Sequence, residues 1–106
     1  MNTLKKTFPL FALFALIQSC GKQPYPCFTT NPDMDDIHVG EAVTFSPYCS
    51  TNGKEYFWQF YGNDDSIEFQ QVVVKYFKDT GEVKVSLDVA NGNKSARVTE
   101  TIVVKP

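Results

Sequence analysis

The chain has 106 residues, with ten Lys or Arg, twelve Asp or Glu and one His, and its net charge is −2. This length fits one small domain and no more. A mildly acidic chain without a basic cluster argues against nucleic acid as a partner and against electrostatic docking onto anionic lipid.

Residues 1–19 have the pattern of an export signal. Lys5 and Lys6 give a positively charged start, and an apolar stretch runs from Phe8 to Ile17. A helix needs about 20 apolar residues to cross a bilayer, so this stretch is too short to span one. A charged start, a short apolar core and small residues at the end are typical of a secretory signal. The alternative, a buried helix of the folded domain, is disfavoured because Gly21 and Pro24 break the helical pattern that precedes them.

The signal ends in Ile17-Gln18-Ser19-Cys20, which resembles the lipobox of bacterial lipoproteins. The resemblance implies that the Cys20 thiol is acylated, that the chain is cleaved before it, and that the mature protein contacts a membrane through this lipid. Two or three acyl chains suffice for durable anchoring, whereas one alone is marginal. Residues 20–26 then form the lipid attachment and a short tether. We expect a lipoprotein of the bacterial cell envelope, at the outer membrane, with the periplasmic face favoured because the tether lacks an acidic run.

The three cysteines are an odd number, and assigning Cys20 to lipid leaves Cys27 and Cys49. An exported chain meets an oxidising compartment in which these two thiols can form a disulfide. Such a bond would contribute roughly 3 kcal/mol in the chain-entropy model, which is useful to a small core. The alternative is two free buried thiols. Together with the lone His38, the two thiols make a poor zinc site.

After the tether, strand-like runs alternate with turn signals, and no segment of ten or more residues keeps a helical period. The clearest strand is 82–89, in which apolar and polar residues alternate strictly. Asn91-Gly92 predicts a hairpin with a type I′ turn. The run 67–77 predicts either one long strand or two strands bent at Gln70-Gln71. Further strands are expected at 27–30, 41–46, 55–60 and 95–105.

This pattern of about seven short strands, with a turn every 8 to 12 residues, indicates an all-β fold, an antiparallel β-sandwich. Trp58 lies in the middle of an aromatic strand and is expected at the centre of the core. Removing Lys5 and Lys6 with the signal leaves eight basic against twelve acidic residues, so the mature chain is near −4.

Residues 27–106 resemble PKD (polycystic kidney disease type) domains, the immunoglobulin-like sandwiches of secreted and surface proteins. The resemblance lies in a glycine-x-x-valine-x-phenylalanine strand, an aromatic-x-tryptophan-x-phenylalanine strand with its glycine turn, and an alternating valine-leucine-valine strand. The matching residues are Gly40, Val43, Phe45, Tyr56, Trp58, Phe60, Gly62, Tyr76, Gly81, Val85, Leu87, Val89 and Asn91. Alternation and resemblance together predict a core of Val43, Phe45, Trp58, Phe60, Tyr76, Val85, Leu87 and Val89.

Two departures from the PKD pattern bear on function. Tyr61-Gly62-Asn63-Asp64 replaces the family's glycine-aspartate-glycine turn, and Val74 stands two residues before Tyr76, where the family has a histidine. Some relatives bind calcium through acidic loops, but no such ligand is transferred onto this altered turn. The altered turn supplies the candidate binding residues, which are Tyr61, Asn63, Asp64 and Asp65.

Acidic loops are the only candidates for a metal site. Asn63, Asp64 and Asp65, or separately the group Asp33, Asp35 and Asp36, could offer oxygens to calcium, which takes six to eight of them. The more ordinary interpretation is that these carboxylates are solvated and cap turns. We therefore assign no metal ligand and no cofactor.

Catalysis is not expected, because a nucleophile with its base cannot be assembled around the lone His38 and no glycine-rich phosphate loop is present. Aromatic residues outside the core alternation are candidates for exposure, and several on one face would form a binding patch. They are Tyr25, Tyr48, Phe57, Tyr61, Phe69 and Phe77. We expect a lipid-anchored, non-catalytic envelope module for protein–protein interaction or structural support. The alternative is a carbohydrate-binding accessory lipoprotein of a transport or degradation system.

Overall fold

The computed structural model describes residues 21–62 and 65–106. The predicted signal peptide, the lipidation site Cys20 and the candidate binding residues Asn63 and Asp64 lie outside the described residues. Among the residues described, no helix is long and apolar enough to cross a membrane. The strands are β1 (Thr29–Asn31), β2 (Ile37–His38), β3 (Ala42–Ser46), β4 (Glu55–Tyr61), β5 (Ser66–Glu68), β6 (Val73–Tyr76), β7 (Gly81–Asn91) and β8 (Lys94–Lys105).

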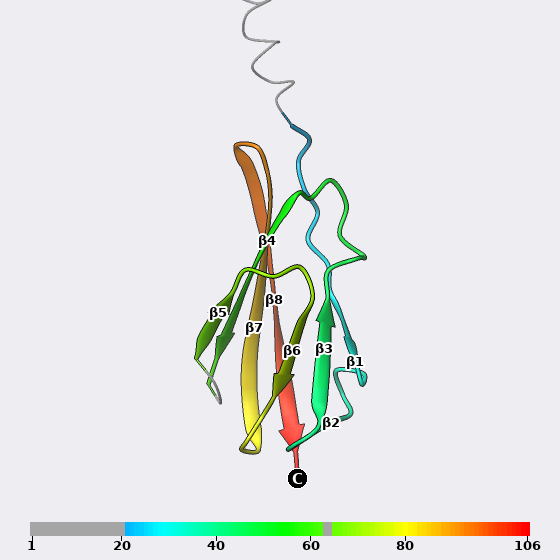
Figure 1. The fold of residues 1–106 in the computed structure, drawn as a ribbon, viewed down its shortest axis with the longest axis vertical. Helices are drawn as coiled ribbons and strands as arrows, with labels where there is room; N and C mark the ends of the chain where they lie inside the picture. Colours follow the sequence, from blue (N-terminus) through cyan, green and yellow to red (C-terminus); the bar gives the residue numbers. More distant parts are fainter. Residues whose placement is uncertain (1–20, 63–64) are drawn as a thin grey trace, which may run out of the picture.

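These strands form two sheets that pack face to face along the long axis of the molecule (Figure 1). One sheet has three strands in the order β1-β3-β6, and the other has five in the order β2-β8-β7-β4-β5. The pairings between described strands are antiparallel, except that β2 runs parallel to β8. The predicted all-β sandwich is therefore confirmed.

The β7–β8 hairpin is the longest element and pairs from Gly81↔Val104 to Asn91↔Lys94. Its turn consists of Gly92 and Asn93, and of these two only Gly92 has a positive φ, of 64°. A type I′ turn needs positive φ at both central residues, whereas a type II′ turn needs it only at the first. The predicted type I′ turn at Asn91-Gly92 is therefore wrong, because the turn begins one residue later and has the type II′ pattern.

Trp58 of β4 lies at the centre of the core, as predicted, and is fully buried. Its ring packs edge-on against Phe28 and Phe45, with centroids 5.3 and 5.8 Å away. The indole N–H donates to the carbonyl oxygens of Gln70 and Gln71, at 3.1 and 3.2 Å. Those carbonyls belong to the segment that carries the chain from β5 in one sheet to β6 in the other. The bend predicted at this pair is confirmed, and Trp58 holds it in place.

The predicted core is confirmed except at β6. Tyr76 is 62% exposed, whereas Phe77, which we expected to be exposed, is completely buried. Along β6 and the residue that follows it, Val73, Lys75 and Phe77 point inward, and Val74 and Tyr76 point outward. The buried members of the predicted core are Val43, Phe45, Trp58, Phe60, Val85, Leu87 and Val89.

Lys75 is a buried cation, with only 8% of its surface exposed. Its ammonium donates to the Ser66 hydroxyl at 2.8 Å and lies 3.4 Å from a Glu68 carboxylate oxygen. It also lies 4.8 Å from the centroid of the Phe60 ring. A buried charge is tolerated only when it is paired in this way. Because Ser66 and Glu68 belong to β5, Lys75 of β6 ties the edge strands of the two sheets together.

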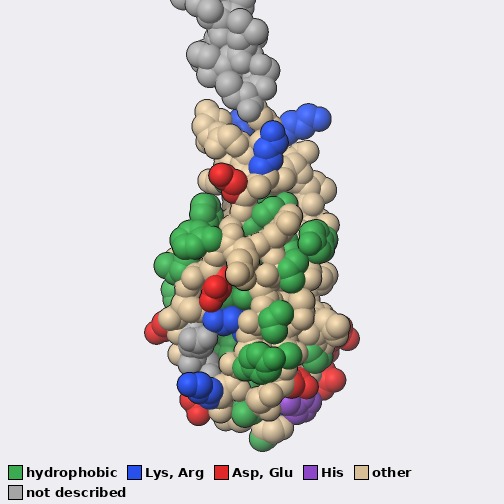
Figure 2. Space-filling view, in the orientation of Figure 1, with side chains coloured by type: hydrophobic (Ala, Val, Ile, Leu, Met, Phe, Trp, Pro, Cys, Tyr) green, Lys and Arg blue, Asp and Glu red, His purple; other side chains and the backbone are tan. Residues whose placement is uncertain are grey.

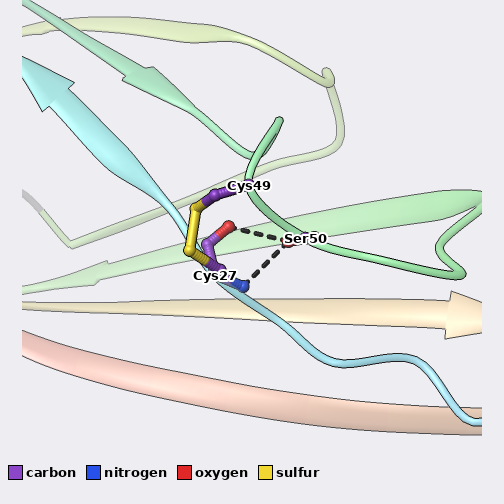
Figure 3. The surroundings of a disulfide bond; sticks show 3 residues. All are labelled: Cys27, Cys49 and Ser50. Atoms are coloured by element: carbon purple, nitrogen blue, oxygen red, sulfur yellow. Dashed lines mark hydrogen bonds between the residues drawn. A yellow bond between two sulfur atoms is a disulfide. The ribbon is translucent and has the colours of Figure 1, made fainter.

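Cys27 and Cys49 form a disulfide, so the pairing rather than the free-thiol alternative holds. Beside it, the Ser50 hydroxyl accepts a hydrogen bond from the Cys27 N–H at 2.8 Å and donates one to the Cys27 carbonyl at 2.7 Å (Figure 3). The disulfide links the segment before β1 to the segment after β3.

The predicted tether, residues 21–26, lies against the sandwich. Tyr25 and Thr51 exchange two backbone hydrogen bonds of 3.1 Å. The side-chain amide of Asn91 donates to the Lys22 carbonyl at 3.3 Å, and that of Asn52 to the Gln23 carbonyl at the same distance. The segment is therefore bound to one end of the domain instead of acting as a free linker.

Candidate functional site

The outer surface of β4 and β5 carries the most promising group of exposed side chains. Side chains alternate along a strand, so while Trp58 and Phe60 point into the core, Phe57, Gln59 and Tyr61 point outward. Ile67 of β5 stands opposite Gln59 and therefore shares this face. We define the β4–β5 face by five residues, Phe57, Gln59, Tyr61, Ile67 and Phe69.

Two apolar side chains of this face are largely in solvent. Ile67 is 55% exposed, and Phe69, directly after β5, is 70% exposed. The rings of Phe57 and Phe69 meet edge to face, with centroids 5.4 Å apart and planes at 88°. At the other end of the face, the Tyr61 hydroxyl donates to the Gln59 side-chain oxygen at 2.7 Å. The face thus combines exposed apolar surface with oriented polar groups.

A shallow groove of about 380 Å³ runs beside the Phe57–Phe69 pair. Its polar lining is a lysine, a carboxylate and an amide, and its apolar lining consists of aromatic rings. Ligand sites typically combine apolar walls with a few polar groups that set the ligand's orientation. The lining residues are Lys54, Glu55, Tyr56, Phe57, Phe69 and Gln71.

Farther across the same sheet, Tyr61 borders a second open depression, of about 520 Å³, with Lys84, Ser86, Arg97 and Thr99. The Arg97 guanidinium donates to both carboxylate oxygens of Asp88, one of them at 2.9 Å. This hydrogen bonding and the charge of Asp88 raise the pKa of Arg97 above its usual value. Arg97 therefore stays charged and points along the sheet toward Asp88.

The predicted binding residues divide between two roles. Tyr61 lies on the β4–β5 face, as a binding role would require. Asp65 instead closes the turn after β4, where its carboxylate accepts a hydrogen bond from the Gly62 N–H at 2.8 Å. Asn63 and Asp64 lie outside the described residues.

The titratable groups of the described residues can be compared with the needs of a metal site. Across residues 21–62 and 65–106, no three His, Cys, Asp or Glu side chains come together in a way that could hold a metal ion. His38 lies at the surface, with its Nδ1 3.9 Å from Asp36 and 3.6 Å from Glu41. Glu41 also accepts a hydrogen bond from the His38 backbone N–H at 2.8 Å, so this carboxylate shapes the turn after β2.

Some residues of the β4–β5 face were predictable from the sequence, and others were not. Tyr25, Tyr48, Tyr61 and Phe69 are exposed as predicted. Ile67 was missed because a three-residue strand is too short to reveal which of its faces is apolar. Lys54 and Gln71 were missed as groove residues because they are ordinary polar side chains in turns, brought beside the aromatic pair only by the fold.

No protein-family model matches the chain, and no curated protein does. Solved structures with a similar fold include the following two. A structure of carbohydrate-binding modules from the β-sandwich superfamily is 27% identical with a TM-score of 0.67, over 80% of this chain and 35% of that one. The PKD1 domain of Vibrio anguillarum Epp is 21% identical with a TM-score of 0.61, over 80% of this chain and 96% of that domain. This chain thus spans about a third of the first structure, and its fold is a PKD-like, immunoglobulin-type β-sandwich.

Proposed function

We propose that the mature chain is a non-catalytic binding module, anchored to the bacterial envelope by a lipid on Cys20, and that it binds its ligand on the β4–β5 face. The observation that carries the proposal is the exposure of Ile67 and Phe69 beside a groove with polar side chains. Exposed apolar groups that cluster next to such a groove are typical of binding sites. The lipid anchor rests on the sequence of residues 1–20.

Carbohydrate is the ligand class that these groups favour. A sugar ring offers C–H groups that pack against an aromatic side chain, and hydroxyls that both donate and accept hydrogen bonds. Phe57 and Phe69 would provide the aromatic contact, while Glu55, Gln71 and Lys54 supply acceptors and donors. The similarity to a structure of carbohydrate-binding modules supports this choice.

A protein partner is the second candidate, and the position of β5 favours it. Within the described chain β5 is the last strand of its sheet, so its outer edge is available for a further strand. An extended peptide could pair with this edge and pack a side chain against Ile67. Such a ligand would use the strand edge rather than the groove.

The first candidate is tested by glycan binding to the chain from Cys20 onward. A glycan array first identifies a soluble oligosaccharide that binds. Calorimetry should then show that Phe69→Ala weakens this binding at least tenfold, because the substitution removes one wall of the groove. Tyr76→Ala is the matched control, since it removes a similarly exposed aromatic residue from the outer surface of the other sheet. Equal affinities of the two variants would exclude the groove as the site.

The anchor has its own test in cells. Cys20→Ala should move the protein from the membrane fraction to the soluble fraction, and intact-mass spectrometry of the wild type should show an acylated chain that begins at Cys20. Cys49→Ala, which removes a different thiol, should leave the protein in the membrane fraction. A wild-type mass without fatty acid would contradict the proposed anchor.

A further inference from the structure

The described chain begins at one end of the sandwich and is held there. Asn91, which is buried, uses its side-chain amide to donate to the Asn52 carbonyl at 2.9 Å and to the Lys22 carbonyl at 3.3 Å. Gly21 lies so close that a Cβ at this position would be 2.9 Å from the Asn91 carbonyl oxygen. Cys20 therefore directly adjoins a segment that is fixed on the end of the domain where β7 turns into β8.

Three lysines that are far apart in the sequence meet at this same end. Lys22 is bound through its carbonyl to Asn91, the Lys54 N–H donates to the Ala90 carbonyl at 2.9 Å, and Lys94 is the register partner of Asn91. Figure 2 shows Lys and Arg side chains gathered at this upper end of the molecule. We define Lys22, Lys54 and Lys94 as the lysine end.

The opposite end of the sandwich is acidic. Gly81 lies at that end of β7 and Asn91 at the lysine end, and eleven residues of strand span about 33 Å. The loops and strand ends that meet there carry most of the acidic side chains of the described residues, together with Lys78 and Lys105. Their carboxylates belong to Asp33, Asp35, Asp36, Glu41, Asp79 and Glu82.

We propose that the lysine end docks onto anionic phospholipid headgroups and holds the anchored domain upright on the membrane. This inference rests on the proposed lipid at Cys20, which would place the acyl chains directly beside Lys22. A charge interacts with a membrane surface only within about one Debye length, roughly 8 to 10 Å at physiological ionic strength. Gly21, the residue after the attachment point, lies against Asn91, to which Lys22 and Lys94 are joined, whereas the acidic end lies about 33 Å away along β7.

The same arrangement explains why the sequence argued against such docking. The mature chain is acidic in total, and the three lysines form no run along the sequence. Folding separates most of the charges along the long axis, so the end next to the anchor has three lysines beside Glu55, the register partner of Ala90, and is net basic although the protein is not. In the upright position the β4–β5 face points sideways, with the Lys54 side of the groove nearest the membrane and Tyr61 farther from it.

The test uses the chain from Cys20 to Pro106, which contains every described strand, with a single myristoyl chain coupled chemically to the Cys20 thiol. One such chain binds neutral vesicles only weakly and reversibly, with an association constant of about 10⁴ M⁻¹. Each lysine near an anionic surface adds about fivefold. We expect partition onto vesicles of phosphatidylglycerol and phosphatidylcholine to exceed partition onto pure phosphatidylcholine by about 100-fold.

Matched triple variants locate the effect. Lys22→Gln/Lys54→Gln/Lys94→Gln should abolish the preference for anionic vesicles. Lys78→Gln/Lys84→Gln/Lys105→Gln, with the same change in net charge, should retain most of it. An equal loss in both variants, or no preference in the parent protein, would overturn the inference. Because the acyl chain is attached chemically, this outcome is independent of whether cells acylate Cys20.

Discussion

The two sheets of the sandwich are assembled in different ways. The five-stranded sheet is built around the β7–β8 hairpin, in which eleven residues of β7 pair with β8 across a two-residue turn. The three-stranded sheet is made of β1, β3 and β6, which are short strands from separate parts of the chain. The first sheet contains two pairings of consecutive strands, β4–β5 and β7–β8, whereas both pairings of the second join strands that are not consecutive in the chain.

The difference shows where a small sandwich needs additional links. Distant contacts require the closure of long loops, which costs conformational entropy before the contacts form. Two links hold the three strands of this sheet in place. The disulfide connects the entry of β1 to the exit of β3, and Lys75 ties β6 to β5. The five-stranded sheet has the long β7–β8 hairpin as its local element, to which β4 and β2 add from distant parts of the chain.

The largest expected effect tests the register of β6. Phe77→Ala removes a fully buried ring and should lower the free energy of unfolding by about 4 kcal/mol, while Tyr76→Ala should change it by less than about 0.5 kcal/mol. Denaturant titration of both variants gives the values. If Phe77→Ala is too unstable to purify, Phe77→Leu should show a smaller loss in the same direction. A larger effect at Tyr76 than at Phe77 would restore the register expected from the sequence.

The disulfide is the next largest contribution, and it should act on one sheet more than on the other. Cys27→Ala/Cys49→Ala opens a loop of 22 residues and should cost about 3 kcal/mol. Native-state hydrogen exchange should show a greater loss of protection in β1 and β3 than in β7 and β8, because only the former lie next to the link. Uniform loss across both sheets would mean that they unfold as one unit. Cys20→Ala serves as the control.

Lys75 gives the smallest of the three effects. Lys75→Ala leaves Ser66 and Glu68 without their shared donor at the edge of the sandwich, and should cost about 1 to 2 kcal/mol. Lys78→Ala, at an exposed position, should be close to neutral. A variant that is as stable as the wild type would show that the link between the two edge strands contributes nothing.

The sequence predicted the fold wherever alternation was unambiguous. In a strand, one of the two alternating sets of side chains, or phases, faces the core. Between 82 and 89 only one phase buries the valines and Leu87, and the structure has that phase. In β6 both phases are possible, because Val72, Val73 and Val74 are consecutive and Lys75 is followed by two aromatic residues. The phase that buries Tyr76 leaves Lys75 exposed, whereas the observed phase exposes Tyr76 and buries Lys75. The protein buries Lys75 because partners on β5 satisfy its charge, and these partners could not be identified from β6 alone.

The candidate site was less predictable than the fold. The exposure of Phe69 followed from its place outside the core alternation, but its pairing with Phe57 depends on how β5 folds back along β4. The lysine end was not predictable from spacing, since it is created by Asn91 holding the first described residues against the hairpin. Both features arise from contacts between segments that are remote in the sequence.

Trp58 is the sole tryptophan of the chain, and its indole touches both layers of the fold. Its intrinsic fluorescence should therefore change both when the two sheets separate and when the segment between β5 and β6 unfolds. A red shift of its emission would mark the moment at which water enters between the sheets. The protein thus carries a built-in optical probe of its own opening, and no label is needed to follow it.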